Sequence, residues 1–286
     1  MREKILEILH HKSDLPPLPQ VLLNLQKLIN DPNSDNQVVA ALVESDPVLS
    51  GRLIALANSA FHGGGREKVS DLPDTLMRLG IDLVLDLAYT LQLPHLFKRV
   101  KGFDQIRFWK HSFSVGLLSE FIAKKIRLPE HEQKVAYIAG LMHDLGILVF
   151  FDMIPDEYRE FTKSVKESEE SLELLEKEKF QITHSDVAYQ FIRNNWKMDP
   201  MVAHSAEWHH RRVKDDKAPT NIRQAVSLAN RIANSKEELS HRITAFQDQP
   251  LGPTTIQNLD MSQDDYDLFL EDVTARVEEA ESLLTS

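Results

Sequence analysis

The chain of 286 residues contains no cysteine, few glycines and prolines, and no long apolar run. Without cysteine, disulfide bonds and thiolate metal ligands are excluded, and the composition fits the reducing cytoplasm, where we expect the protein. Only 10 glycines and 13 prolines occur, so a fibrous or largely disordered chain is not expected. The most apolar stretch, residues 83–97, is interrupted by Asp86, Gln92, Pro94 and His95, and we therefore expect no membrane span.

Basic residues are also in deficit, with 33 Lys and Arg against 44 Asp and Glu, for a formal net charge of -11 at pH 7. Such a chain repels phosphate backbones and anionic lipid surfaces at long range. We therefore expect neither a nucleic-acid polymer nor a membrane as its partner. The first ten residues mix charged and apolar side chains, so we expect no secretory signal there.

Apolar residues recur at helical spacing along nearly the whole chain, and no convincing alternation of apolar and polar residues predicts a strand. Asp46-Pro47 is typical of a helix start, and Gly80 of a helix end. The sequence therefore predicts an all-α fold. The helical patterns cover residues 21–29, 38–43, 49–57, 72–79, 83–91, 106–126 and 135–145.

The segment from Pro94 to Gly102 is predicted to join two helical parts, residues 1–100 and residues 101–286. The second part ends in an amphipathic stretch, predicted to be a helix that packs back on the core. Lys163 to Lys179 is rich in Glu and Lys, and we interpret it as a solvated helical excursion rather than a site. The glycine-rich His62 to Arg66 is predicted to be a flexible turn, because it lacks the Gly-Lys-Ser/Thr ending of a phosphate-binding loop.

Histidine is the residue type that points to chemistry. The dipeptide His143-Asp144 ends the apolar helix predicted from Ala139. An imidazole nitrogen and a carboxylate oxygen at one helix end suit zinc, iron or manganese. A capping aspartate beside a chance histidine explains the dipeptide equally well when it is taken alone.

Four further histidines lie on neighbouring predicted helices: His111, His184, and the adjacent His209 and His210. Helical bundles build metal sites from inward-facing side chains of several helices. The five histidines and Asp144 therefore predict one metal-binding pocket. The alternative is that each histidine is separately buried or caps a helix.

Several short segments stand out, in order, along the chain: Leu15 to Pro19, Ser45 to Pro47 with Leu53, Ala57 to Phe61, Arg78 to Gly80, Phe108 to His111, Leu141 to Gly146, Thr183 to Ala188 and Trp208 to His210. In these segments the chain resembles the HDOD family, a bacterial signalling branch related to the HD-domain phosphohydrolases. The resemblance covers about residues 15–233.

The resemblance implies an HD-domain-like helical bundle with an additional N-terminal helical subdomain, and a stand-alone module with a regulatory role. It implies one or two divalent ions, Fe, Mn, Zn or Ni. The positions that match the family's metal site are His111, His143, Asp144, His184, His209, His210 and Asn230.

Two positions depart from the related hydrolases. Asn230 stands where they carry a late aspartate, and Ile147 stands where the enzymes that cleave cyclic dinucleotides carry a lysine. Two divalent cations would bring four positive charges, against which Asp144 supplies one negative charge. Buried, uncompensated charge costs on the order of several kcal/mol per ion. We therefore expect weak occupancy, a single metal ion or none.

The sequence leaves three functions open. The first, which we favour, is a regulatory or signal-transduction module with a degenerate metal site that binds a protein partner or a small ligand such as a nucleotide. The second is a metal-dependent phosphohydrolase acting on a phosphate ester or nucleotide, with metal-bound hydroxide as the nucleophile. The third is a structural adaptor whose histidines have no special role. No residue is assigned as catalytic.

Overall fold

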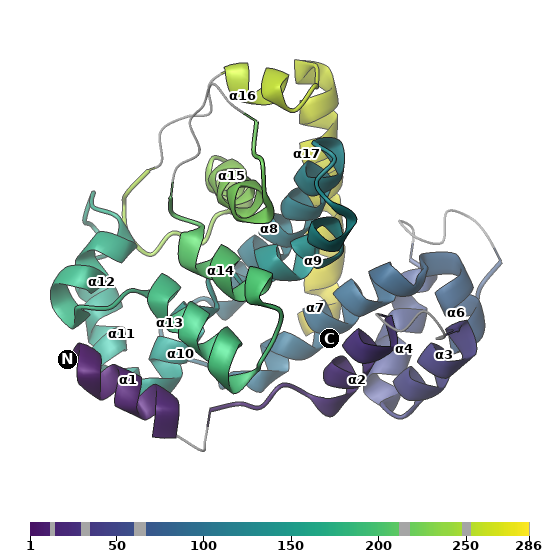
Figure 1. Cartoon of the computed structure of the whole chain (residues 1–286), viewed down its shortest axis with the longest axis horizontal. Helices are drawn as coiled ribbons and strands as arrows, with labels where there is room; N and C mark the ends of the chain where they lie inside the picture. Colours follow the sequence, from purple (N-terminus) through teal and green to yellow (C-terminus); the bar gives the residue numbers. More distant parts are fainter. Residues whose placement is uncertain (12–14, 30–34, 60–66, 212–217, 248–252, 286) are drawn as a thin grey trace. The chain divides into compact units, whose positions relative to one another are not determined.

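The computed structural model describes residues 1–11, 15–29, 35–59, 67–211, 218–247 and 253–285. Within these ranges every regular element is a helix, which confirms the predicted all-α class (Figure 1). The glycine-rich turn predicted at His62 to Arg66 lies outside the described residues.

The chain divides into two compact units. The larger comprises Met1–Leu15 and Phe97–Glu278, and the smaller comprises Pro16–Leu96 and Glu279–Ser286. The domain limits expected from the sequence, 1–100 and 101–286, stay predictions. All of the predicted metal-site residues belong to the larger unit.

The smaller unit consists of short helices with clear end signals. The Asp35 carboxylate caps α3, and the Asp46 carboxylate accepts hydrogen bonds from the backbone N–H groups of Val48 and Leu49, with Pro47 as the first helical residue of α4. Gly80, at φ 82°, ends α6 as the sequence predicts. The helices are α2 (Gln20–Ile29), α3 (Asn36–Glu44), α4 (Pro47–Ala57), α6 (Leu72–Leu79) and α7 (Ile81–Leu96).

The larger unit is a helical bundle in which the long helix α8 packs against α9 and α15. Its helices are α1 (Arg2–His11), α8 (Gln105–Lys125), α9 (Glu130–Leu141), α10 (Leu145–Met153), α11 (Pro155–Ser164), α12 (Leu172–Phe180), α13 (His184–Gln190), the π-helix η1 (Phe191–Asn195), α14 (Pro200–Trp208), α15 (Ile222–Asn234), the 3-10 helix η2 (Glu237–Leu239), α16 (Pro253–Asn258) and, as far as Glu278, α17 (Gln263–Thr285).

Two glycines allow helices to approach each other on either side of His143-Asp144. A Cβ atom on Gly140 would lie 2.5 Å from the carbonyl oxygen of Val115, which shows how closely α9 crosses α8. A Cβ atom on Gly146 would lie 1.9 Å from the carbonyl oxygen of His184, so the start of α10 touches the start of α13. This second contact brings Asp144 and His184 together, because each residue lies within two positions of it.

The C-terminal helix α17 packs on the bundle, as its amphipathic pattern predicts. Val273 and Val277 are buried, and the ring of Phe269 stacks on Phe121 of α8 with centroids 3.7 Å apart. Burial of this apolar stripe holds the helix in place.

No single helix in the described ranges is long and apolar enough to cross a membrane. The consecutive helices α9 and α10 satisfy that length and composition test only as a pair, with a bend of 44° between them.

Candidate metal centre

Asp144 is the centre of the candidate site. It lies in the turn between α9, which ends at Leu141, and α10, so the dipeptide follows the apolar helix directly. The residue is 5% exposed, and its carboxylate has imidazoles on both sides. The Nε2 atoms of His209 and His184 lie 3.0 and 3.4 Å from Oδ1. The Nε2 atoms of His143 and His111 lie 3.1 and 3.7 Å from Oδ2.

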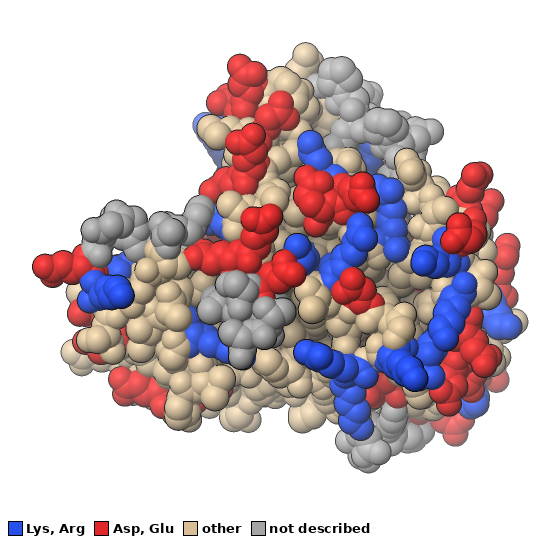
Figure 2. Space-filling model, turned by 180° about the vertical axis from the view of Figure 1, so that it is seen from behind, with Lys and Arg blue, Asp and Glu red and all other residues tan. Residues whose placement is uncertain are grey.

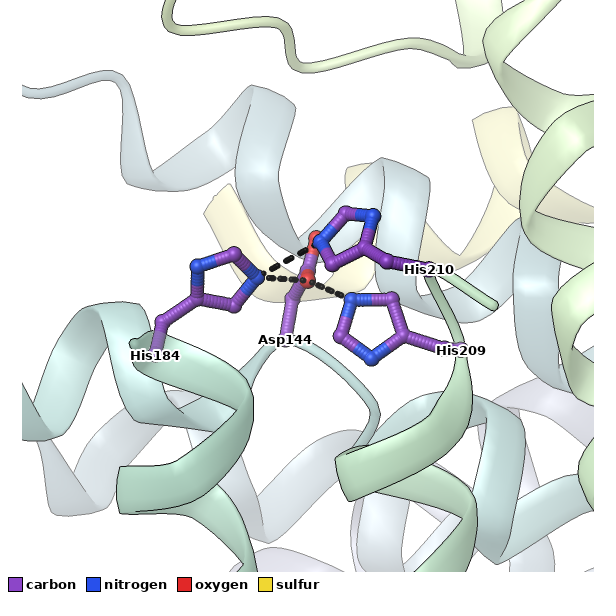
Figure 3. Close-up of side chains that lie close together, drawn as sticks. All are labelled: Asp144, His184, His209 and His210. Atoms are coloured by element: carbon purple, nitrogen blue, oxygen red, sulfur yellow. Dashed lines mark hydrogen bonds and ion pairs between the residues drawn. The ribbon is translucent and has the colours of Figure 1, made fainter. Parts of the chain in front are cut away.

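The structure thus brings the predicted histidines together from four places in the bundle. His111 comes from α8, His184 is the first residue of α13, and His209 is the C-cap of α14. His210 joins them through His184, whose Nε2 is 2.8 Å from the Nε2 of His210 (Figure 3). The rings of His184, His209 and His210 approach Asp144 from two elements, as Figure 3 shows.

The outer nitrogens of four imidazoles are held by acceptors. Nδ1 of His111, His143 and His209 lies 2.8, 2.7 and 2.6 Å from the backbone carbonyls of Leu239, Gly140 and Ala206. Nδ1 of His184 lies 2.7 Å from Oε2 of Glu176. A carbonyl or carboxylate oxygen can only accept, so each Nδ1 carries a proton, and each ring, when neutral, turns the lone pair of Nε2 toward the site.

Lone pairs that face a carboxylate repel it unless a cation lies between them. Oδ1 of Asp144 and Nε2 of His209 illustrate the problem, since both atoms are buried and lie only 3.0 Å apart. A proton or a metal ion would satisfy them. Donor atoms bound to one metal at about 2.0–2.1 Å lie roughly 3 Å apart, and the distances around Asp144 fall in this range. The residues therefore fit a metal ion.

The pKa values of the cluster show which of its groups carry charge when protons, rather than a metal ion, lie between them. Burial raises the pKa of Asp144, but the charge of His143 and hydrogen bonds to His143, His184 and His209 outweigh burial and hold that pKa well below its usual range. Burial lowers the pKa of His184, yet Glu176 and Asp144 together raise it well above its usual value. For His111 and His209 burial prevails and the pKa is lowered. A second proton on His184 therefore competes with a metal ion there.

Glu176 corrects the prediction that Lys163 to Lys179 is only a solvated excursion. This side chain on α12 is fully buried, and its carboxylate accepts hydrogen bonds from the backbone N–H and Nδ1 of His184 and from the hydroxyl of Tyr158. The prediction was wrong at Glu176 because it assumed that a charged residue in a Glu- and Lys-rich segment is exposed to solvent. The available signal was position, since Leu172, Glu176 and Phe180 share one helix face at four-residue spacing.

His241 is a second residue that the sequence prediction missed. It follows η2 in a segment without helical periodicity, and its Nε2 lies 2.7 Å from Oδ2 of Asp144. Nothing in the local pattern distinguishes it from a surface histidine.

Asn230 lies on α15, buried at 3% exposure, and lines the same pocket as Asp144. Its Oδ1 accepts a hydrogen bond of 2.9 Å from Nδ2 of Asn234. The prediction that Asn230 binds metal stays a prediction.

A pocket of about 570 Å³, part of it open to solvent, adjoins the cluster. Its polar lining includes the hydroxyls of Ser171 and Thr244 and the side chain of Arg242, while Phe246 and three aliphatic residues supply apolar surface. His210, which is exposed, lies at the junction between this pocket and the buried cluster. The pocket therefore connects the buried cluster to solvent.

Comparison with known proteins gives the family. The HDOD domain model matches residues 15–212, most of the chain, and the chain belongs to the HDOD domain family. A curated relative, an uncharacterised protein of Treponema pallidum (strain Nichols), is 24% identical over 200 residues, 69% of this chain. The chain spans 38% of the length of that relative.

Solved structures agree on the fold. An HDOD domain protein of unknown function from Geobacter sulfurreducens has a TM-score of 0.76 at 21% identity, covering 97% of each chain. A candidate signal transduction protein from Marinobacter aquaeolei VT8 has a TM-score of 0.75 at 20% identity, covering 100% of this chain and 66% of the other. A candidate phosphohydrolase from Shewanella amazonensis SB2B has a TM-score of 0.66 at 18% identity, covering 98% of both.

Proposed function

We propose that the chain is a metal-binding HDOD regulatory module, in which the centre around Asp144 receives a small ligand from the adjoining pocket and signals its presence to a partner protein. The observation that carries the proposal is the common orientation of four imidazoles, each held at Nδ1 and each directing Nε2 to one buried carboxylate. Such outer hydrogen bonds fix the tautomer and direction of histidine ligands in metal sites.

The charge of the cluster favours binding of metal ions more strongly than the sequence analysis suggested. Glu176 adds a second buried carboxylate beside His184, so two divalent ions would leave two positive charges rather than three. That is the balance an aspartate at position 230 would have supplied. We therefore propose that the site holds Fe, Mn, Zn or Ni ions in the folded protein, with the nitrogen-rich donor set favouring Zn, Fe and Ni over Mn.

The pocket offers histidines rather than carboxylates for proton transfer. Among the described residues that line it, Asp144 is the sole carboxylate, and imidazoles surround it on both sides. A general acid or base toward a bound substrate would therefore be a histidine.

A partner protein or small ligand also fits the surface better than a nucleic-acid polymer. The formal net charge is -11. Acidic side chains accompany the basic ones on the face drawn in Figure 2, and a surface of this kind does not attract a phosphate backbone.

The test is elemental analysis of the purified chain before and after incubation with manganese, iron, zinc and nickel, beside a panel of phosphate esters and nucleotides. We expect bound metal in the wild-type chain, none in Asp144→Asn, ligand-induced thermal stabilisation and no turnover. A chain that binds none of these metals contradicts the proposal.

A second candidate, a metal-dependent phosphohydrolase, is favoured by one observation. His210 is exposed at the pocket and offers an imidazole for proton transfer to a leaving group. Phosphate release that requires metal and disappears in both His210→Ala and His143→Ala would establish hydrolysis in place of simple binding.

A further inference from the structure

Asn230, which lines the pocket beside Asp144, is poorly disposed to bind a metal ion. The Asn230 amide oxygen already accepts from Asn234, and Asn234 in turn accepts from the hydroxyl of Ser240 at 2.9 Å. The Asn230 oxygen is therefore engaged in a hydrogen-bond chain with Asn234 and Ser240. An amide oxygen is in any case a weak, uncharged ligand.

His241 approaches Asp144 more closely than any other imidazole of the cluster does. Its Nε2 is 2.7 Å from Oδ2, against 3.1 Å for His143 and 3.7 Å for His111. The side chain is 8% exposed, and the ring lies edge-on to His111 with centroids 4.7 Å apart. Donor atoms of His111, Asp144 and His241 all lie within 4.8 Å of one another, as ligands of one ion require.

The segment that carries His241 is firmly anchored to α8. Nε of Arg107 donates to the carbonyl of Ser240 at 2.6 Å, and its Nη2 donates to that of Glu237 at 2.9 Å. The carbonyl of Leu239 accepts from Nδ1 of His111. The same short segment therefore orients His111 and delivers His241, although it lies beyond residues 15–212 that the family model matches.

We infer that His241 is a metal ligand of this chain, and that it supplies from this segment the ligand position that Asn230 leaves unfilled on α15. The inference rests on the proposed metal centre. His241 gives the Oδ2 side a donor set of two imidazoles and one carboxylate oxygen, together with His111 and Asp144. Such a nitrogen-rich set selects zinc, cobalt, iron or nickel over magnesium or manganese.

The test uses the full chain stripped of metal and titrated with Co²⁺ and with Zn²⁺. Stoichiometry is measured by elemental analysis after desalting, and ligation by the visible absorption of bound cobalt. We expect two ions per wild-type chain. In His241→Ala we expect one ion at wild-type affinity, and a second bound at least about tenfold more weakly, since even loss of an outer hydrogen-bond partner costs 10–100-fold.

Three further variants keep the inference open to refutation. Asn230→Ala should retain two ions, and so should His204→Ala, a partly exposed histidine of α14 that bonds Glu207 away from the centre. His241→Asp should restore the second ion with a cobalt spectrum changed by the exchange of nitrogen for oxygen. Circular dichroism of the metal-free variants checks folding.

The outcomes separate the two proposals. If His241→Ala keeps both ions at wild-type affinity, or if Asn230→Ala loses one, then His241 is only a hydrogen-bond donor to Asp144 and the inference is overturned while the metal centre stands. If the wild-type chain binds no cobalt or zinc, both fail. Should His241→Ala not fold, the spectrum of His241→Asp decides: an unchanged cobalt spectrum overturns the inference.

Discussion

The two sides of the Asp144 carboxylate are built differently. The Oδ1 side takes His184, His209 and His210 from α13 and the end of α14, and a buried acid, Glu176, stands behind it. On the Oδ2 side the imidazoles are backed by backbone carbonyls or, at Nδ1 of His241, by no acceptor among the described residues. The negative charge behind the imidazoles is thus concentrated on the Oδ1 side, at Glu176. We therefore expect the Oδ1 side to bind its metal ion more tightly than the Oδ2 side does.

The largest effect is expected from removing what the two sides share. Asp144→Asn takes away the charge that both sets of imidazoles face, so we expect metal binding to disappear on both sides. Elemental analysis after reloading measures it. A variant that retains one equivalent of metal would show that one side works without this carboxylate.

Gly146→Ala should disrupt the Oδ1 side of the centre and leave the Oδ2 side in place. Its Cβ would meet the His184 carbonyl at 1.9 Å, so α13 must move away from Asp144. We expect the Oδ1 side to lose its ion, the Oδ2 side to keep one, and the free energy of unfolding in urea to fall by about 3 kcal/mol.

Gly51→Ala is the matched control for that change. Gly51 lies within α4, and nothing stands within 4 Å of an added Cβ there. Its replacement should raise the free energy of unfolding by about 0.5–1 kcal/mol and leave metal binding unchanged. Equal losses in both variants would refute the contact between α10 and α13 as the cause.

Glu176→Gln tests the charge behind the Oδ1 side alone. The amide keeps the shape and one acceptor for Nδ1 of His184 but removes the negative charge, so we expect 10–100-fold weaker binding of one ion. Calorimetric titration with zinc resolves the two ions. Glu178→Gln, an exposed neighbour on α12, should have no effect. Equal weakening of both ions would mean that the two sides are not distinct.

The smallest effect is expected from Tyr158→Phe. The Tyr158 hydroxyl donates to Oε1 of Glu176, one step further from the metal position. Burial, followed by the charge of Glu176, raises the pKa of Tyr158 well above its usual value, so the hydroxyl stays protonated and keeps donating. We expect less than a tenfold loss of affinity, confined to the Oδ1 side. A larger loss than in Glu176→Gln would contradict this order of influence.

Much of this centre could be predicted from the sequence, for a specific reason. His111, His143, Asp144, His184, His209 and His210 lie on or directly beside helices, where apolar periodicity shows which segments face the core. The structure brings the six side chains together, and their role as metal ligands stays a prediction. Asn230 was placed correctly on a helix at the pocket, but its engagement with Asn234 depends on a neighbour one turn away and on Ser240.

Glu176 and His241 could not be predicted from apolar periodicity, each for a different reason. A buried acid within a run of Glu and Lys is recognisable only when its partner is known, because the contact with His184 spans two helices. His241 lies in an irregular segment, where no periodicity reports the direction of a side chain.

By itself, the sequence determined the helical class, several helix ends and the set of histidines, because these depend on local spacing and capping along one chain. Only the tertiary structure decided which nitrogen of each imidazole faces Asp144, that Glu176 lies beneath His184, and that His241 reaches the carboxylate. These features depend on close approach between segments distant in the chain, such as α10 against α13 at Gly146. Packing at that distance is set by the whole bundle and not by any local pattern.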